Sequence, residues 1–237
     1  MRGTTPFRWE LLLKVGGSLG QRASLRPLLQ RIALLAGRRR LLVVPGGGLY
    51  ADLVRDQMRR RGIDERTAHH MALLAMDQYG LFLSSLMRRS AAVDNLRTAE
   101  LVAEAGRVPI LLASSLVRGE TTLERSFRLT SDSIAAYLAG RLRAAHLVLL
   151  KSVSRPPGRL RDRASADRLA RHGVVDPLFA GMMPATSTIW VLNGRRPSEL
   201  DRFMPIVRRD GAGGRPAAAR PVVTARSGHR SRPRATT

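Results

Sequence analysis

The chain alternates between short, continuous apolar runs and longer segments in which apolar residues recur every three or four positions. Continuous runs of this length are typical of strands buried on both faces, whereas the recurring pattern is typical of helices with one buried face. The predicted strands are residues 11–15, 41–44, 108–112, 146–151 and 188–193. This alternation indicates an α/β fold, and we expect a three-layer α/β/α sandwich with a mostly parallel central sheet.

The segments between these strands predict the covering helices. Their ranges are 25–35, 50–61, 64 to about 89, 98–105, a helix that begins at 130–132, 167–172 and 197–203. Asp64 is a suitable N-cap, because its carboxylate can accept a hydrogen bond from the first turn of the helix that follows. Residues 113–129 and 152–164 are polar or rich in proline and glycine, and we expect irregular connections there.

The 237 residues carry a formal net charge of +23, but this charge is not gathered in one motif. Eight arginines and one aspartate fall in residues 208–237, a stretch rich in alanine, glycine and proline that we expect to be a disordered tail. Aromatic residues, which could stack on bases, make up only 4% of the chain. We therefore expect nucleic acid not to be the main partner.

The sequence also excludes several classes of site. Without cysteine the chain can form neither a disulfide nor a thiolate metal site, and its five histidines lack metal-ligand spacing. No apolar run is long enough to span a bilayer, and the N-terminus lacks the order of a secretory signal. We expect a cytoplasmic protein that does not bind membranes.

The first predicted strand ends in Lys14 and Val15, followed by Gly16, Gly17 and Ser18. Glycine lets the backbone come close to a ligand, and successive N–H groups in such a turn can bind an anion. The stretch matches neither of the two common phosphate loops, G-x-x-x-x-G-K-[ST] and G-x-G-x-x-G. Taken alone, it is either a phosphate-binding edge or an ordinary strand-to-helix turn.

The second predicted strand ends in a similar loop, Pro45 followed by Gly46, Gly47 and Gly48. In open parallel sheets, the loops at the carboxyl ends of the strands line the ligand crevice. A second glycine loop at the equivalent place favours a ligand site between the two loops.

Lys14 and Lys151 are the only lysines in a chain whose other basic side chains are arginines, apart from five histidines. Each lies at or near the end of a predicted strand. Lysine is a compact charge on a flexible stem, which suits a moving phosphate group. Asp132 falls in the first turn of a predicted helix, where it is either an ordinary acidic cap or part of the same site.

Taken together, four motifs resemble those of the amino acid kinase family. They are Lys14-Val15-Gly16-Gly17-Ser18, Pro45-Gly46-Gly47-Gly48, Thr130-Ser131-Asp132-Ser133-Ile134-Ala135-Ala136 and Leu149-Leu150-Lys151. The resemblance covers about residues 9–205, so we expect a kinase-like domain at 1–207 before the tail at 208–237. Within the family, the chain is most similar to the branch that includes the kinase acting on 5-(aminomethyl)-3-furanmethanol phosphate in methanofuran-type cofactor biosynthesis.

The resemblance implies transfer of the γ-phosphoryl group of ATP, with Mg²⁺, to a small acceptor. Lys14 would contact the transferred group, Asp132 would orient the lysines and help to organise Mg²⁺, and Lys151 would bind the nucleotide phosphates. No residue is implied as an assured direct metal ligand. The implied nucleotide- or phosphate-binding residues are Gly16, Gly17, Ser18 and Ser131, and the implied acceptor-binding residues are Gly46, Gly47, Gly48 and Asp52.

The chain departs from the family pattern in two places. Where many members have an acidic residue and Asp-Gly just after the strand, this chain has Lys151-Ser152-Val153-Ser154. The usual Gly-Met-x-x-Lys element appears as Gly181-Met182-Met183-Pro184-Ala185, without the lysine. Either Lys151 supplies the second positive charge, or nucleotide binding is weakened. Three functions stay open: a kinase that converts a phosphate monoester to a diphosphate, a kinase for a carboxylate or UMP, and a nucleotide-binding or storage protein without transfer activity. In each case we expect a homo-oligomer.

Overall fold

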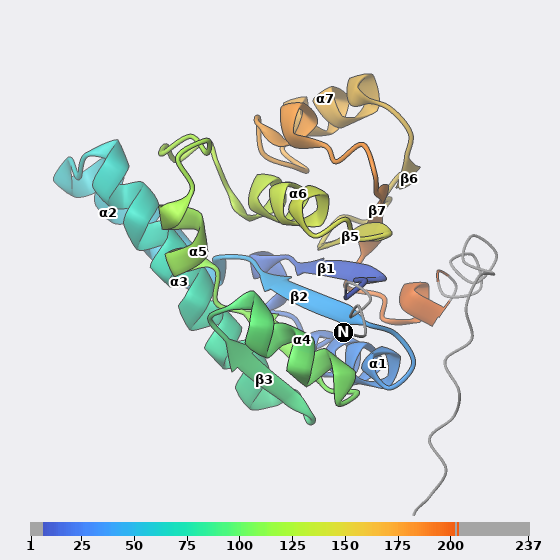
Figure 1. Cartoon of the computed structure of the whole chain (residues 1–237). Coiled ribbons are helices and arrows are strands. Elements are labelled where there is room, and N and C mark those ends of the chain that lie inside the picture. The colour runs from blue at the N-terminus through green and yellow to red at the C-terminus, as the bar shows by residue number, and fades with distance from the viewer. Residues whose placement is uncertain (1–6, 202, 204–237) are drawn as a thin grey trace, which may run out of the picture.

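In the computed structural model, which describes residues 7–201 and 203, the chain forms a seven-stranded sheet (Figure 1). The strands are β1 (Leu11–Val15), β2 (Leu41–Pro45), β3 (Ser90–Val93), β4 (Val108–Leu111), β5 (His146–Lys151), β6 (Gly158–Leu160) and β7 (Thr188–Asn193). Their order across the sheet is β3-β4-β2-β1-β5-β7-β6. All neighbours pair in parallel except β6, which runs antiparallel to β7 at one edge. Because β1 is parallel to both β2 and β5, the carboxyl ends of these three strands lie side by side at the same end of the sheet.

Helices cover both faces of this sheet. They are α1 (Leu25–Ala36), α2 (Gly48–Arg61), α3 (Glu65–Leu86), α4 (Leu96–Glu104), α5 (Ser114–Gly119), α6 (Ser131–Arg141) and α7 (Arg163–Arg171), with short 3-10 turns η1 (Gly17–Leu19) and η2 (Phe179–Met182). One apolar core joins the sheet to α1 and the C-terminal half of α3, and a second core on the other face joins it to α4, α6 and α7. The predicted three-layer α/β/α sandwich with a mostly parallel sheet is confirmed.

Local chemistry explains where the longest helix begins. Gly62 takes a left-handed conformation, with φ of 64°, and ends α2. Asp64 then caps α3, because its carboxylate accepts a hydrogen bond of 2.9 Å from the N–H of Thr67. The predicted cap is confirmed, although α3 ends at Leu86 rather than near residue 89.

Three elements differ from the sequence-based expectation. The expected irregular segment 113–129 contains α5, whose first N–H groups face the carboxylate of Asp77, 3.2 Å from the nitrogen of Ser114. The expected loop 152–164 contains β6, and β3 lies where no strand was predicted. Both strands lie at the edges of the sheet and are held by backbone pairing with β7 and β4. Edge strands this short carry little apolar pattern, so sequence alone does not indicate them.

Two further expectations concern the rest of the chain. Residues 198–201 and 203 are helical, in agreement with the last predicted helix. The predicted tail, 208–237, lies outside the described residues. Within residues 7–201, no helix is long and apolar enough to cross a membrane.

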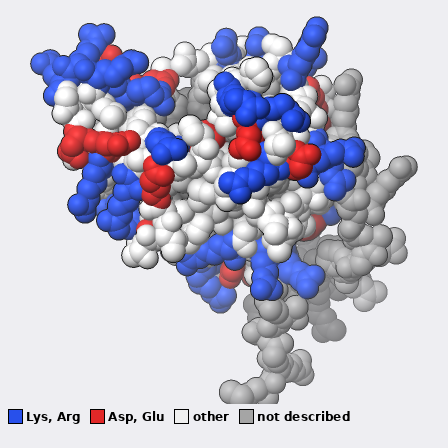
Figure 2. All heavy atoms as spheres, turned by 90° about the horizontal axis from the view of Figure 1, so that it is seen from above, with Lys and Arg blue, Asp and Glu red and all other residues white. Residues whose placement is uncertain are grey.

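On the face of the molecule seen in Figure 2, basic side chains form several separate groups with acidic side chains between them. Some are paired locally on α2, where Asp52 contacts Arg55 and Asp56 contacts Arg60. Surface pairs of this kind contribute little to stability.

The buried strand β1 makes a direct test of this core possible. Leu12 is fully buried, whereas Leu34 of α1 is 68% exposed. We expect Leu12→Ala to lower the free energy of unfolding by about 2–5 kcal/mol, because it leaves a cavity. Leu34→Ala should change it by less than about 0.5 kcal/mol, because little apolar surface is lost. Urea unfolding measures both, and equal effects would contradict the described core.

Candidate active site

The site lies at the carboxyl edge of the sheet, where β1 and β5 are neighbours. Lys14 is the fourth residue of β1 and pairs in register with Leu149, and Lys151 is the last residue of β5. Lys14 is only 4% exposed although it carries a charge. A buried ammonium group requires a compensating charge nearby.

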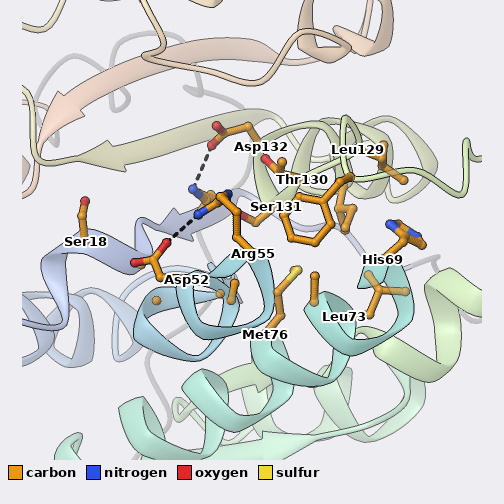
Figure 3. A pocket seen from close by; sticks show the side chains of 18 of the residues that line it. Ser18, Asp52, Arg55, His69, Leu73, Met76, Leu129, Thr130, Ser131 and Asp132 are labelled. Atoms are coloured by element: carbon orange, nitrogen blue, oxygen red, sulfur yellow. Dashed lines mark hydrogen bonds and ion pairs between the residues drawn. The ribbon is translucent and has the colours of Figure 1, made fainter. Parts of the chain in front are cut away.

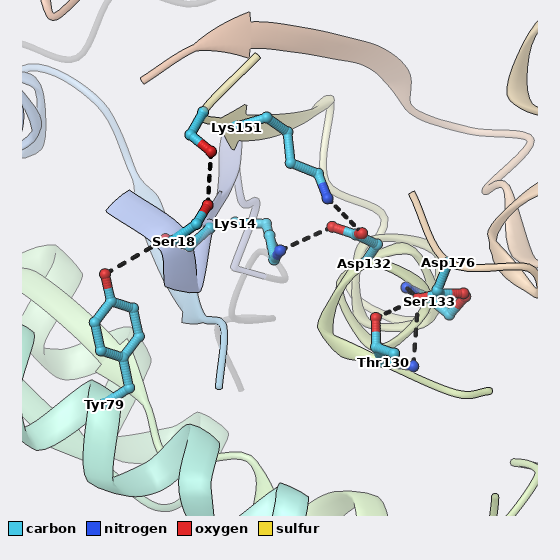
Figure 4. A network of polar contacts seen from close by, with 10 residues as sticks. Lys14, Ser18, Tyr79, Thr130, Asp132, Ser133, Lys151 and Asp176 are labelled. Carbon is cyan, nitrogen blue, oxygen red and sulfur yellow. Dashed lines mark hydrogen bonds and ion pairs between the residues drawn. The ribbon is translucent and has the colours of Figure 1, made fainter. Parts of the chain in front are cut away.

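Asp132 supplies that charge from α6, and it contacts both lysines (Figure 4). Its Oδ1 atom lies 2.9 Å from Nζ of Lys14, and its Oδ2 atom accepts a hydrogen bond of 2.6 Å from Nζ of Lys151. The Asp132 side chain is 4% exposed. Three residues far apart in the sequence therefore form one buried cluster of two cations and one anion.

The pKa values in this cluster follow from burial and mutual charge. Burial lowers the pKa of Lys151 to about 8, and repulsion from Lys14 acts in the same direction, whereas Asp132 opposes it. Burial alone would raise the pKa of the Asp132 carboxyl group, but Lys14 and Lys151 more than offset this, so its pKa is lower than usual. Asp132 is therefore ionised at neutral pH, and the pKa of Lys151 lies unusually close to neutral pH for a lysine.

A second buried carboxylate, which sequence reasoning missed, holds the helix that carries Asp132. Asp176 accepts hydrogen bonds from the backbone N–H and the hydroxyl group of Thr130, at 3.3 and 2.7 Å, and from the N–H of Ser133 at 3.0 Å. Thr130 is the N-cap of α6 but makes no capping bond with its own side chain. Asp176 thus caps α6 from a distant segment, which no local spacing could indicate.

The two glycine loops touch each other directly. A Cβ atom added to Gly17 would overlap the backbone nitrogen of Gly48 and lie 2.6 Å from its Cα atom. Gly48 itself has a positive φ of 57°, which favours glycine. The close contact places the start of α2 next to η1.

Gly16 and Gly46 lie next to the contact between the loops, where each bonds to a strand of the sheet. The N–H of Gly16 donates to the carbonyl oxygen of Leu150, and that of Gly46 donates to the carbonyl oxygen of Val15, both at 2.9 Å. A Cβ atom on either glycine would lie 2.7 Å from a neighbouring backbone atom. These two glycines join the loops to the sheet, and their N–H groups are already used.

A cavity of about 230 Å³ opens between the glycine loops, α2, α3 and the start of α6 (Figure 3). Nine of the eleven predicted site residues line it, Gly16 and Gly46 being the exceptions. The nine are Lys14, Gly17, Ser18, Gly47, Gly48, Asp52, Ser131, Asp132 and Lys151. The structure therefore brings both loops and the charged cluster to one cavity.

A model of the amino acid kinase family matches residues 10–155, which is more than half of the chain. The chain belongs to the amino acid kinase family. Over 204 residues it is 27% identical to the [5-(aminomethyl)furan-3-yl]methyl phosphate kinase of Methanocaldococcus jannaschii, a match that covers 83% of this chain and 92% of that protein.

Solved structures of other family members have the same fold. Uridylate kinase from Archaeoglobus fulgidus superimposes with a TM-score of 0.61 at 17% identity, over 84% of this chain and 95% of that chain. UMP kinase from Ureaplasma parvum gives a TM-score of 0.60 at 14% identity, over 84% of this chain and 96% of that chain. At these identities the likeness concerns the fold alone.

This chain differs from the family pattern at Ala185, where the Gly-Met-x-x-Lys element would place its lysine. Of the two lysines in the sequence, Lys14 contacts one carboxylate oxygen of Asp132 and Lys151 contacts the other (Figure 4). The cluster therefore holds two cations without a lysine at residue 185.

The cavity wall also contains side chains beyond the eleven predicted site residues. Arg55 lies 5.3 Å from the ring centroid of Phe127 and 2.6 Å from Asp52. His69 closes the end of the cavity away from Ser18 (Figure 3). Arg55 lies about two turns into α2 and His69 about one turn into α3, and both line the cavity. Their positions follow from the α2–α3 pairing and so could not be deduced from spacing alone.

The contact between the loops leads to a prediction for Gly17. We expect Gly17→Ala to lower turnover by at least about tenfold, because its methyl group would force the two loops apart and shift Lys14 relative to α2. Gly119→Ala is a suitable control, since a Cβ atom there meets nothing within 4 Å. Steady-state kinetics of both variants, with thermal unfolding to confirm folding, makes the comparison. A folded Gly17→Ala protein with the original rate would contradict it.

Proposed function

We propose that this chain is a kinase that transfers the γ-phosphoryl group of ATP to a small phosphate monoester and so forms a diphosphate. The observation that carries the proposal is the buried pair of ammonium groups, Lys14 and Lys151, held on either side of Asp132 at the wall of the cavity. Phosphoryl transfer depends mainly on positioning and on offsetting negative charge. Two lysines held by one acid are suited to both tasks.

In the proposed reaction, an oxygen of the acceptor phosphate attacks the γ-phosphorus of ATP. The new O–P bond forms as the bond between the γ-phosphorus and the bridging oxygen breaks, and ADP leaves with the electron pair. A phosphate monoester needs no general base, because its second pKa is about 6 and it is already an oxyanion at neutral pH. Lys14 would contact the transferred group, and Lys151 the nucleotide phosphates.

The residues that line the cavity suit Mg²⁺ that is bound mainly by the nucleotide phosphates rather than by the protein. Among the described residues, no group of three His, Asp or Glu side chains could hold a metal ion. Both oxygens of Asp132 already face ammonium groups. Mg²⁺ typically keeps several waters and binds phosphate oxygens, and there it neutralises charge. Asp132 would then orient the lysines rather than bind the ion directly.

The acceptor side combines apolar walls with charge. Leu73, Met76 and Phe127 line the cavity, as do Asp52 and Arg55. An acceptor with a flat, apolar ring and a phosphate suits these walls, and an amine would suit Asp52. The relative in M. jannaschii is named for a substrate of this kind, [5-(aminomethyl)furan-3-yl]methyl phosphate. We propose that compound as the first acceptor to test.

One observation favours a different function. The absence of a lysine at residue 185 leaves one fewer cation than the family pattern provides. A nucleotide-binding or storage protein without transfer activity would follow if Lys151 does not replace it. Calorimetry with ATP, run beside an ADP-release assay, separates the two functions. The acceptor panel should contain the aminomethylfuran phosphate, UMP and a carboxylate, and binding without ADP release on any of them would reject the kinase.

The low pKa of Lys151 predicts a pH dependence. Below pH 8 Lys151 is protonated and can offset phosphate charge, and above it the charge is lost. We expect kcat/KM, which reports ionisations of the free enzyme, to fall as pH rises through about 8. In Lys151→Arg we expect the fall in kcat/KM to disappear from the region near pH 8, since a guanidinium group stays charged there. A wild-type profile that stays flat well above pH 8 would contradict the role of Lys151.

The role of Lys14 is tested by removing its charge. We expect Lys14→Ala to lower kcat by at least about a hundredfold, because the transferred group loses a preorganised cation in a buried site. Arg26→Ala removes an exposed cation of α1 that does not line the cavity, and should leave kcat unchanged. The rate of ADP release by both variants, measured at saturating ATP, tests whether Lys14 takes part in the transfer. An unchanged rate for Lys14→Ala would remove it from the mechanism.

A further inference from the structure

Asp176 is a buried carboxylate outside the cavity wall, 6% exposed, in the segment before η2. Besides its bonds to Thr130 and to the N–H of Ser133, it accepts hydrogen bonds from the hydroxyl group of Ser133 and from the N–H of Leu178, the latter at 3.1 Å. Five donors therefore converge on one carboxylate. In the part of the chain that the structure describes, it forms no ion pair within 4.0 Å.

These bonds enclose the residue that holds the lysines. Thr130 and Ser133 lie on either side of Asp132 in the first turn of α6, and Asp176 bonds to both of them (Figure 4). A rigid first turn limits how far the Asp132 side chain can move. Because Asp132 contacts Lys14 and Lys151 at 2.9 and 2.6 Å, a displaced turn would displace the contacts of both lysines.

Charge balance supports the same conclusion. Lys14, Lys151 and Asp132 together carry one excess positive charge in a buried site. Asp176 is close enough to attract Lys151 electrostatically. With Asp176 the cluster holds two cations and two anions, which reduces the cost of burying them. The carboxylate also lies at the N-terminus of a helix, where negative charge is favourable.

We propose that Asp176 is a positioning residue of the phosphoryl-transfer site, which fixes the first turn of α6 and thereby holds Asp132 between the two lysines. This inference rests on the proposed function for its kinetic consequences, but not for its structural ones. Asp176 does not line the cavity, so it acts through Asp132 rather than on the substrate.

Asp176→Asn is the main test. The asparagine side chain has nearly the same shape as aspartate, but its NH2 group is a donor where a carboxylate oxygen accepted hydrogen bonds, so it would face other donors. We expect kcat to fall by about tenfold to a hundredfold, the loss typical of a small displacement of a catalytic group. The KM values for ATP and acceptor should change less than kcat, since Asp176 itself does not line the cavity. Ser133→Ala, which removes only one of the five bonds, should give a smaller fall in kcat and keeps the test available if Asp176→Asn does not fold.

A double-mutant cycle distinguishes positioning from general stability. If Asp176 acts through Asp132, adding Asp176→Asn to Asp132→Asn should lower kcat by less than about twofold more. An additive fall would show independent effects and overturn the proposal. Asp64→Asn, which alters the cap of α3 instead, is the matched control and should leave kcat unchanged.

A second readout does not depend on activity. Since the sequence has two lysines, protein labelled with nitrogen-15 lysine gives two side-chain ammonium signals, one from Lys14 and one from Lys151. We expect both signals to shift in Asp176→Asn and neither to shift in Asp64→Asn. Unchanged signals in folded Asp176→Asn would overturn the positioning role, as would an unchanged kcat. A wild-type protein without turnover would reject the proposed function alone, and the signals would still decide this inference.

Discussion

The attraction between one buried carboxylate and two buried ammonium groups is the constraint on which the site depends. Lys14 and Lys151 lie on neighbouring strands, and their mutual repulsion would oppose burial in a medium of low dielectric constant. Asp132 makes the arrangement stable by contacting both. Burial still lowers the pKa of Lys151 to about 8, so the compensation is incomplete. In the proposed reaction, a phosphate group in the cavity would add negative charge beside the two lysines.

Close packing of backbone is the second constraint. The loops after β1 and β2 meet where Gly17 and Gly48 have no side chains, and Gly16 and Gly46 join these loops to the sheet. Side chains at these positions would hold the loops apart. The glycines therefore have two distinct tasks. Gly17 and Gly48 line the cavity and let the two loops touch, and Gly16 and Gly46 join the loops to the sheet.

The two constraints connect fold, family and function. The chain belongs to the amino acid kinase family and shares its overall fold with uridylate kinase from Archaeoglobus fulgidus. Two features of this chain bear on function. Lys151 bonds to Asp132, although residue 185 is not a lysine. The cavity wall places Arg55 over the ring of Phe127. These features support a small, ring-bearing phosphate as acceptor, because apolar and charged groups lie within one cavity.

The sequence by itself determined the strands β1, β2, β4, β5 and β7, since continuous apolar runs are needed wherever a strand is buried on both faces. It also indicated the glycine loops and the two lysines, because these residue types at strand ends need no partner to be noticed, whereas the expectation that Asp132 belongs to the site came from the resemblance to the family. Only the tertiary structure decided the edge strands β3 and β6, the helix α5 and the hydrogen bonds of Asp176 to the start of α6. Each of these depends on hydrogen bonds to residues distant in the chain, and such bonds leave no periodic pattern in the local sequence.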